Sequence, residues 1–386
     1  MTTEPAAVEY DGAGILDRVQ ATVQRYCILP NRHAVTAVTL FIAYTHAASV
    51  FDYAPRLVLS SPEKRSGKTR CLEIIGHLSH RPLWTANAST AALYRSLARP
   101  RTLLLDEADT VFGTRHKAEQ NEDLRGLLNA GFQRGTPVIR YDASAKTVME
   151  LHTFAPVVLA AIGRLPDTVT DRAVNIAMRR RKPGEHVEPF RVTRDVEPLQ
   201  ALAYELDCWI TDNHETLKHA RPLLPVYDRA ADLWEPLVAV ADLASGRWPE
   251  RARHAATGLT ADAATADADH SPSHELLLDT RAVLEQFEGD FIPTEALISR
   301  LTRIPDSRWQ DEGLTGRRLA ILLRPYGITV GRANNRMRDR GYHHRDFRDA
   351  FARYLHTPEP TPGPGPAMRP QPADTTTQPP DQQEHV

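Results

Sequence analysis

The stretch LVLSSPEKRSGKTR, residues 57–70, decides the fold that this sequence predicts. An apolar segment typical of a strand runs into a short polar loop, which ends in Ser-Gly-Lys-Thr before a helix that we expect from about Arg70 to His77. A strand, loop and helix in this order form a P-loop, in which backbone N–H groups point at phosphates. The full pattern begins with glycine, and Pro62 stands in that place here. Because Ser-Gly-Lys-Thr also occurs by chance at helix N-termini, the prediction depends on a second motif.

The expected nucleotide-binding residues are consecutive: Pro62, Glu63, Lys64, Arg65, Ser66, Gly67, Lys68, Thr69 and Arg70. Within this loop we expect Lys68 to reach the β- and γ-phosphates of the nucleotide. We expect the hydroxyl of Thr69 to ligate the Mg²⁺ ion that accompanies the phosphates.

A second stretch, TLLLDEAD at residues 102–109, predicts the other half of the same site. Its apolar run is typical of a parallel strand buried on both faces, and acids at the carboxyl end of such a strand lie where α/β sheets bind ligands. In this Walker B pattern Asp106 is expected to hold Mg²⁺, and Glu107 to orient or deprotonate the attacking water. A buried strand with a polar exit is common by itself, but the two motifs in this order predict NTP binding and hydrolysis.

The composition limits the classes of function that the chain can have. A formal net charge of −2 over 386 residues provides no bulk attraction to nucleic acid, so any basic DNA-binding surface must be local. Three scattered cysteines predict neither a disulfide framework nor a zinc cluster, and they fit a reducing cytoplasm. The acidic N-terminus predicts no signal peptide. Residues 34–51 are apolar enough to raise the question of a membrane span, but their polar members favour a buried helix.

The pattern of strands and helices predicts an α/β fold followed by helical segments. We expect an AAA+-like P-loop core with a helical lid, and a small C-terminal domain of the winged-helix type. The expected boundaries are an N-terminal helical collar (1–52), the core (53–195), the lid (196–256), a flexible linker (257–273), the winged-helix-like domain (274–356) and a disordered tail (357–386). Within the core, residues 137–151 read as a β-hairpin with Lys146 near its tip.

The C-terminal domain carries a local excess of arginine. Between residues 314 and 345 eight arginines face a single acid, Asp339. Such an excess is typical of phosphate contacts, and Arg332, Arg336 and Arg338 are the expected DNA-binding residues. A solvated face in an arginine-rich sequence is the alternative. A strand-like run, Ile328 to Val330, is expected to form the β-element of this domain.

These motifs together resemble the P-loop ATPases of phages and integrated mobile elements, a family of helicase- and primase-associated domains of unknown function. The resemblance runs from about residue 16 to residue 355. It rests on the stretches 61–70 and 100–109, on LLNAG at 127–131, LPD at 165–167 with Asp171-Arg172, DLWEPL at 232–237, and Gly341-Tyr342 with Phe347 and RYL at 353–355. The family is similar to ring-forming AAA+ motors, including superfamily-three helicases.

The resemblance implies roles for residues that the patterns leave open. Arg172 matches the position of an arginine finger, which would reach the γ-phosphate of a neighbouring subunit. A surface arginine paired with Asp171 is the alternative. In related motors a hairpin like 137–151 lines a central pore, so the resemblance implies that Arg134, Arg140 and Lys146 contact single-stranded DNA. A plain exposed hairpin is the alternative.

The sequence therefore predicts a cytoplasmic ATPase that requires ATP and Mg²⁺, assembles into a homo-oligomeric ring and acts on DNA. The resemblance implies that this ring is a hexamer. The implied setting is the replication of a phage or mobile element, with a separate primase or initiator as a partner. One alternative is an ATP-dependent switch or loader, or a phage-defence ATPase, that remodels a protein partner without unwinding DNA. Another is a DNA-binding regulator in which the P-loop is a sensor.

Overall fold

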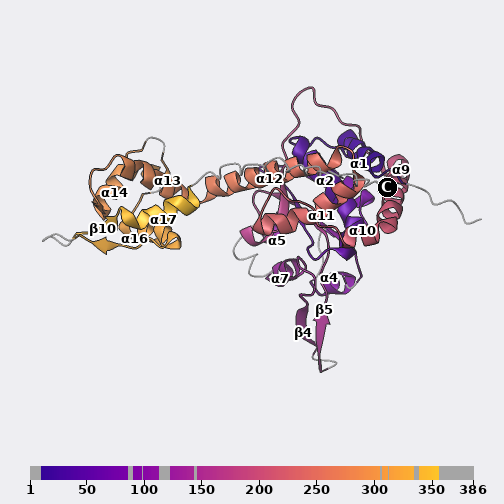
Figure 1. Cartoon of the computed structure of the whole chain (residues 1–386), viewed down its shortest axis with the longest axis horizontal. Coiled ribbons are helices and arrows are strands. Elements are labelled where there is room, and N and C mark those ends of the chain that lie inside the picture. Colours follow the sequence, from indigo (N-terminus) through magenta and orange to yellow (C-terminus); the bar gives the residue numbers. More distant parts are fainter. Residues whose placement is uncertain are drawn as a thin grey trace, which may run out of the picture. The chain divides into compact units, whose positions relative to one another are not determined.

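The computed structural model describes residues 10–85, 90–97, 99–112, 122–142, 146–304, 307–311, 313–333 and 339–355. Two compact units divide the chain, Met1–Ala266 and Asp267–Val386 (Figure 1). The predicted disordered tail, residues 357–386, lies outside the described residues.

A five-stranded parallel sheet forms the centre of the first unit. Its strands stand in the order β2-β3-β6-β1-β7, and every neighbouring pair is parallel. Their bounds are β1 (Arg56–Ser61), β2 (Pro82–Thr85), β3 (Thr102–Leu105), β6 (Val157–Ile162) and β7 (Ala173–Ala177). The three central strands are almost entirely buried, which explains the run of apolar residues in each of them. The predicted α/β class with a largely parallel sheet is confirmed.

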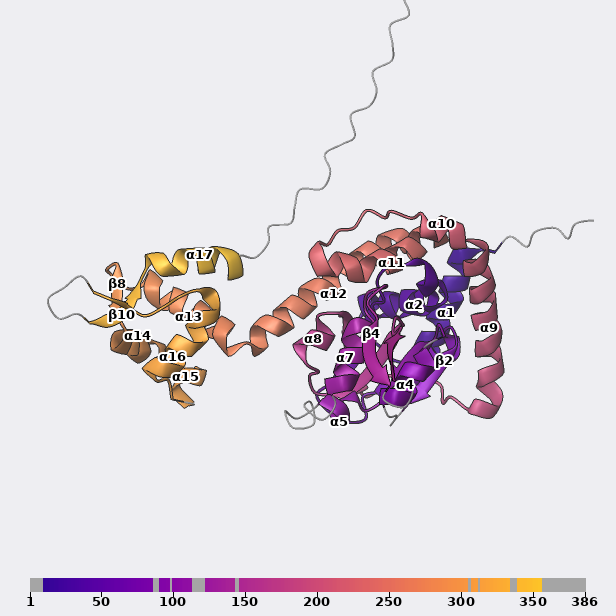
Figure 2. The ribbon, with the colours of Figure 1, turned by 90° about the horizontal axis from the view of Figure 1, so that it is seen from below.

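Helices cover both faces of this sheet (Figure 2). Because side chains alternate along a strand, Leu57 and Leu59 of β1 enter one core while Val58 enters the other. The first core includes α1 (Gly12–Tyr26), α2 (Arg32–Ala47), α3 (Lys68–Leu78), α9 (Val192–Asp212), α11 (Asp228–Ala244) and the start of α12 (Trp248–His270). The second includes α4 (Thr90–Leu97), α5 (Ala108–Phe112), α7 (Glu122–Ala130) and α8 (Asp167–Thr170).

The predicted division into a collar, a core and a lid does not describe how these helices pack. Leu206 and Trp209 of α9 and Leu237 of α11 lie in the same hydrophobic core as Phe41 of α2 and the strand β1. The helices expected to form a collar and a lid are therefore one layer on one face of the sheet. The short elements η1 (Ala48–Val50) and α10 (His214–Lys218) also belong to this first unit.

Helix α2 accounts for the apolar stretch that raised the question of a membrane span. Among the described residues, 32–50 form the one helical stretch long and apolar enough to cross a membrane, and 78% of its apolar window is buried inside the protein. Asn31 caps this helix by accepting a hydrogen bond from the Ala34 N–H at 2.8 Å. The prediction of a buried helix beside the sheet is confirmed.

The predicted hairpin is present as β4 (Val138–Asp142) and β5 (Thr147–Leu151). The two strands pair antiparallel from Val138–Leu151 to Asp142–Thr147 and form a sheet of their own. Figure 1 shows them projecting beyond α4 and α7.

The prediction of a flexible linker over residues 257–273 was wrong for most of its length. Helix α12 continues to His270, and α13 (Pro272–Glu285) begins two residues later. The stretch is rich in alanine, the best helix former, and it lacks an apolar period because only its beginning packs into the core.

The second unit combines helices with a three-stranded antiparallel sheet in the order β8-β10-β9. Its strands are β8 (Phe291–Pro293), β9 (Gly331–Arg332) and β10 (Arg340–His343). Its helices after α13 are α14 (Thr294–Leu301), α15 (Arg308–Asp311), α16 (Gly316–Leu323), the turn η2 (Arg324–Tyr326) and α17 (Arg345–Tyr354). The strand expected at 328–330 was misplaced, since Ile328 is a buried core residue that precedes β9.

Candidate functional site

The loop between β1 and α3 has the conformation that a helix N-terminus needs to face a ligand. Gly67 immediately precedes α3 with a φ of 83°, in the left-handed region. A Cβ there would meet no atom within 4 Å, so glycine is required by backbone conformation and not by space. Helix α3 starts at Lys68, two residues earlier than the sequence predicted, and its first N–H groups have no partner within the helix.

The side chain of Lys68 folds back into this loop. Its ammonium donates hydrogen bonds to the Ser61 hydroxyl at 2.5 Å, to the Ser66 hydroxyl at 3.1 Å and to the Glu63 carbonyl at 3.4 Å. Lys68 is only 8% exposed. Burial lowers the pKa of Lys68, and the carboxylates of Asp109 and Asp106 oppose that shift. The loop therefore holds a desolvated positive charge, and within the described part of the chain its direct hydrogen-bond partners are neutral oxygens.

Acidic residues gather at the carboxyl end of β3. Asp106 and Glu107 follow the strand directly, and Asp106 Oδ1 accepts a hydrogen bond from the Glu107 N–H at 2.9 Å. Glu107 has a φ of 53°, which costs a residue with a side chain about 1 kcal/mol. Strain of this kind is retained where the surrounding structure holds a side chain in a particular direction.

A pocket of about 370 Å³ joins these two groups of residues. The loop and α3 line one side, and the end of β6 lines the floor with the small residues Ala160 and Ala161. Since β6 lies between β1 and β3, the two motifs stand about 10 Å apart, or two strand spacings. The full lining comprises residues 64–70, Asp106, Glu107, Asp109 and residues 160–162.

Most of the predicted nucleotide-binding residues meet in this pocket. Lys64 through Arg70 line it together with both predicted catalytic acids, whereas Pro62 and Glu63 are outside the lining. Arg70 is already engaged, because its guanidinium pairs with Glu73 at 2.6 Å and lies over the Phe190 ring. Hydroxyl and carboxylate oxygens at Thr69, Asp106 and Asp109 are the hard ligands that Mg²⁺ prefers, so the residues present fit this ion.

Two residues that support the site were not predicted. Asp109 Oδ1 accepts a hydrogen bond from the Ile162 N–H at 2.8 Å, which fixes the start of α5 to the end of β6. Arg180 holds the loop from outside, through the Lys64 carbonyl at 3.0 Å and the Glu63 carboxylate at 2.8 Å. Asp109 stands within the quoted acidic motif, but the long-range contact of Arg180 has no local signal in the sequence.

Arg172 does not reach the pocket of its own chain. Arg172 immediately precedes β7, and the first residue of β7 is in register with Arg56 at the start of β1. Lys68 follows the other end of β1, so the two residues lie at opposite ends of the sheet. The length of β1 puts roughly 20 Å between these two ends. The Arg172 guanidinium donates to the Thr168 carbonyl at 2.9 Å. Asp171, its expected partner in the alternative interpretation, pairs instead with Arg229 at 3.0 Å.

A buried arginine lies beside Arg172. Arg56 is 1% exposed, and its guanidinium and that of Arg172 both lie within 6 Å of the Phe132 ring centre. Burial, with a smaller effect from the Arg172 charge, lowers the pKa of Arg56 to about 9. Its Nη1 donates to the Ala54 carbonyl, whereas its Nη2 has no hydrogen-bond partner among the residues that the structure describes.

The residues predicted to contact DNA have different environments. Arg134 has a structural role, because its guanidinium donates to the carbonyls of Phe51, Ala48 and Ser49 at 2.9–3.0 Å and lies 4.2 Å from the Phe154 ring. Arg140 and Lys146 are exposed on the hairpin, with Arg140 5.9 Å from the Tyr94 ring.

Of the three arginines predicted in the C-terminal domain, only Arg332 lies among the described residues. It is exposed on β9 directly opposite Arg340 of β10. Arg336 and Arg338 lie outside the described residues.

Fold and site together define an α/β protein with a lysine-bearing loop and a cluster of acids at the carboxyl edge of a parallel sheet. Residues 177–354 match a family model described as "Protein of unknown function (DUF3631)". The chain is also similar to an "Uncharacterized 28.9 kDa protein in xis 5'region" of Saccharopolyspora erythraea, with 41% identity over 186 residues that make up 46% of this chain and 68% of the relative. The chain belongs to the family of that protein.

Proposed function

We propose that this protein is a Mg²⁺-dependent ATPase of the AAA+ type that assembles into a ring and acts on DNA, as a replicative helicase of a phage or mobile element does. The observation that carries the proposal is the buried Lys68 ammonium facing Asp106, Glu107 and Asp109 across one pocket. A desolvated cation next to free helix N–H groups is suited to a polyphosphate, and the acids opposite are suited to the metal and the water that hydrolysis needs.

Each residue of the pocket has a separate part in this proposal. Lys68 would exchange its hydrogen bonds to the neutral hydroxyls of Ser61 and Ser66 for stronger ones to the negatively charged β- and γ-phosphates. Thr69 and Asp106 would hold Mg²⁺, which supplies positive charge that neutralises the phosphate oxygens. Glu107 would orient the attacking water, with its direction set by the strained backbone.

The position of Arg172 supports the proposed assembly into a ring. If this residue is a finger, it serves the pocket of a neighbouring subunit, because it stands at the far end of the sheet from its own. Its half-buried guanidinium, held by Thr168, is preorganised for such a contact. Hydrolysis between subunits would couple each ATP to a movement of the ring.

The hairpin supports single-stranded DNA as the substrate. It combines basic Arg140 and Lys146 with the exposed ring of Tyr141, and cations with aromatic rings are the usual means of holding single strands. In the second unit, Arg332 and Arg340 face each other across β9 and β10, where two like charges favour a phosphate between them. Helices with this small antiparallel sheet support the winged-helix interpretation.

The description of the Saccharopolyspora relative places it 5′ of xis, which hints at a mobile element. That hint supports the proposed setting, in which a cytoplasmic replication protein of such an element acts with a separate primase or initiator.

One observation favours a second function. The hairpin also exposes Ile139, Val148 and Met149, at 65%, 61% and 39%. Exposed apolar side chains gathered on one element are typical of a surface for another protein. An ATP-dependent switch or loader that remodels a protein partner is therefore the alternative to a helicase.

ATP hydrolysis by the purified chain, with and without single-stranded DNA, tests the proposal. We expect hydrolysis to rise with DNA, to vanish in Lys68→Ala, and to fall in Arg172→Ala with ATP binding retained. Hydrolysis that is indifferent to DNA would favour the protein-remodelling alternative, and an absence of hydrolysis in the wild type under both conditions would refute the ATPase assignment.

A further inference from the structure

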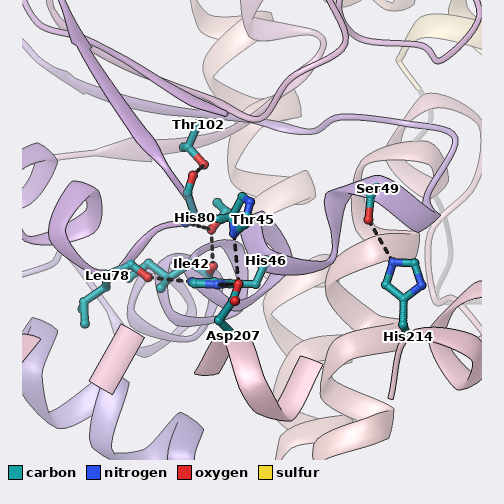
Figure 3. A network of polar contacts seen from close by, with 9 residues as sticks. All are labelled: Ile42, Thr45, His46, Ser49, Leu78, His80, Thr102, Asp207 and His214. Carbon is teal, nitrogen blue, oxygen red and sulfur yellow. Dashed lines mark hydrogen bonds and ion pairs between the residues drawn. The ribbon is translucent and has the colours of Figure 1, made fainter. Parts of the chain in front are cut away.

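We propose that His46, His80 and Asp207 form a binding site for a divalent transition metal, for which Zn²⁺ is the best fit. Figure 3 shows the three side chains converging from α2, from the turn between α3 and β2, and from α9. One ligand atom from each lies within 4.8 Å of the other two. None of the three lines the pocket at Lys68, so this site is separate from the proposed nucleotide site.

The hydrogen bonds of His46 require a cation at this point. Its Nε2 lies 2.9 Å from the Leu78 carbonyl, which can only accept, so Nε2 carries the proton. In the neutral ring Nδ1 then has a lone pair, and it faces the carboxylate oxygen Oδ1 of Asp207 at 2.9 Å. Two lone pairs at this distance repel each other unless a proton or a metal ion lies between them.

His80 supplies the third ligand atom to the same place. Its Nδ1 is 3.0 Å from the same Oδ1 of Asp207. Three protein ligand atoms around one point, two of them imidazole nitrogens and one a carboxylate oxygen, are a ligand set that Zn²⁺ accepts, with water as the fourth ligand. Ligand atoms in a tetrahedral zinc site are about 3.3 Å apart, so the two nitrogen–oxygen separations of 2.9 and 3.0 Å need to open by only a few tenths of an ångström.

The surrounding groups orient these ligands as metal sites require. Metal-bound histidines usually donate their second ring N–H to a carbonyl or carboxylate, which is what Nε2 of His46 does with Leu78. Two hydrogen bonds fix the backbone of His80. Its N–H donates to the Thr45 hydroxyl at 3.0 Å, and its carbonyl accepts from the Thr102 hydroxyl at 2.9 Å. The His46 side chain is 3% exposed, whereas His80 and Asp207 are 26% and 42% exposed, so an ion has access from solvent.

A metal here would join three segments of the first unit that are distant in sequence. Leu78 is the last residue of α3, the helix that begins at Lys68, and its carbonyl is one of those that a helix end leaves without a partner. The ion would hold that helix end to α2 and α9. We therefore expect the metal ion to stabilise the fold and to take no part in the proposed ATP hydrolysis at Lys68, at the other end of α3.

Metal content and thermal unfolding of the full-length protein test this proposal. The protein is loaded with Zn²⁺, dialysed against metal-free buffer and assayed for bound zinc, and its Tm is measured with and without EDTA. We expect the wild type to retain stoichiometric zinc and to lose about 5 °C of Tm in EDTA. Replacement of bound Zn²⁺ by Co²⁺ should give the visible absorption of a tetrahedral site.

His80→Asn and Asp207→Asn should each weaken zinc binding at least about tenfold. Both side chains are partly exposed, so these variants are expected to fold. His214→Asn is the matched control. The His214 ring contacts the Ser49 hydroxyl at a distance of 2.9 Å, and this pair lies apart from the three ligands (Figure 3). The His214→Asn variant should therefore retain the metal. Lys68→Ala should also retain zinc. The zinc measurement therefore tests the metal site independently of whether the protein is an ATPase. A wild type that retains no zinc and shows no EDTA effect would overturn the proposal and leave a proton between His46 and Asp207.

Discussion

The ammonium of Lys68 donates a 2.5 Å hydrogen bond to the hydroxyl of Ser61, the last residue of the strand that leads into the loop. A buried ammonium would gain more from an anion than from a neutral hydroxyl, because two opposite charges attract each other strongly where little water screens them. This contact therefore marks the position at which a phosphate oxygen would enter, and it leads to the first prediction.

Lys68→Ala should weaken ATP binding about 10- to 100-fold, since a hydrogen bond to a charged group contributes about 1.5–3 kcal/mol. Binding of a fluorescent ATP analogue measures the change. Lys64→Ala is the matched control, because Lys64 belongs to the same loop but is exposed, and only its carbonyl is used by Arg180. Equal losses in the two variants would mean that the loop attracts ATP by general charge and that Lys68 has no special place.

Glu107→Gln should retain ATP binding and lose about 10²- to 10⁴-fold in hydrolysis, because the amide cannot accept a proton from water. Single-turnover hydrolysis measures the rate, and size-exclusion chromatography with ATP detects the assembled ring that this variant should trap. Glu63→Gln, outside the pocket and paired with Arg180, should hydrolyse ATP at nearly the wild-type rate. Normal hydrolysis by Glu107→Gln would remove this residue from the mechanism.

Tyr141→Ala should weaken single-stranded DNA binding about tenfold, since stacking of a base on an aromatic ring contributes about 1–3 kcal/mol. Basal hydrolysis should not change, because Tyr141 is 65% exposed on the hairpin and does not line the pocket. Fluorescence anisotropy with a labelled oligonucleotide checks the affinity. Tyr204→Ala removes another exposed ring, from α9, and should have no effect. Unchanged DNA binding in Tyr141→Ala would favour a protein partner at this hairpin.

Arg56→Met should raise the free energy of unfolding by about 1 kcal/mol, because it removes a buried charge that pairs with no carboxylate among the residues the structure describes. Arg134→Met should lower the free energy of unfolding by about 2 kcal/mol or more, since three carbonyls would lose their donor. Urea denaturation of the two variants compares the effects. Similar losses of stability in both would indicate that Arg56 has an anionic partner.

The parts of the structure that were predictable are those with strong local patterns. The strands Thr102–Leu105 and Val157–Ile162 are continuous apolar runs because both of their faces are buried. The loop at Gly67 could be placed because a strand, a Ser-Gly-Lys-Thr motif and a helix stand next to one another in the sequence.

The parts that were not predictable depend on contacts between distant residues. Arg134 reads as a basic residue of the hairpin region, and only the fold brings its guanidinium to three carbonyls near residue 50. His46 and Asp207 are 161 residues apart, so no spacing motif connects them. The helix over residues 257–270 was missed because helix propensity without an apolar period was interpreted as a linker.

The most direct test of a shared active site is a mixing experiment with Lys68→Ala and Arg172→Ala. Each variant alone should be nearly inactive as an ATPase. In mixed rings, an intact Lys68 from one subunit can meet an intact Arg172 from its neighbour, because the two residues lie at opposite ends of the sheet in one chain. We predict that mixing restores a substantial part of the ATP hydrolysis. No recovery on mixing, with mixed assembly verified by co-purification of differently tagged subunits, would contradict hydrolysis between subunits.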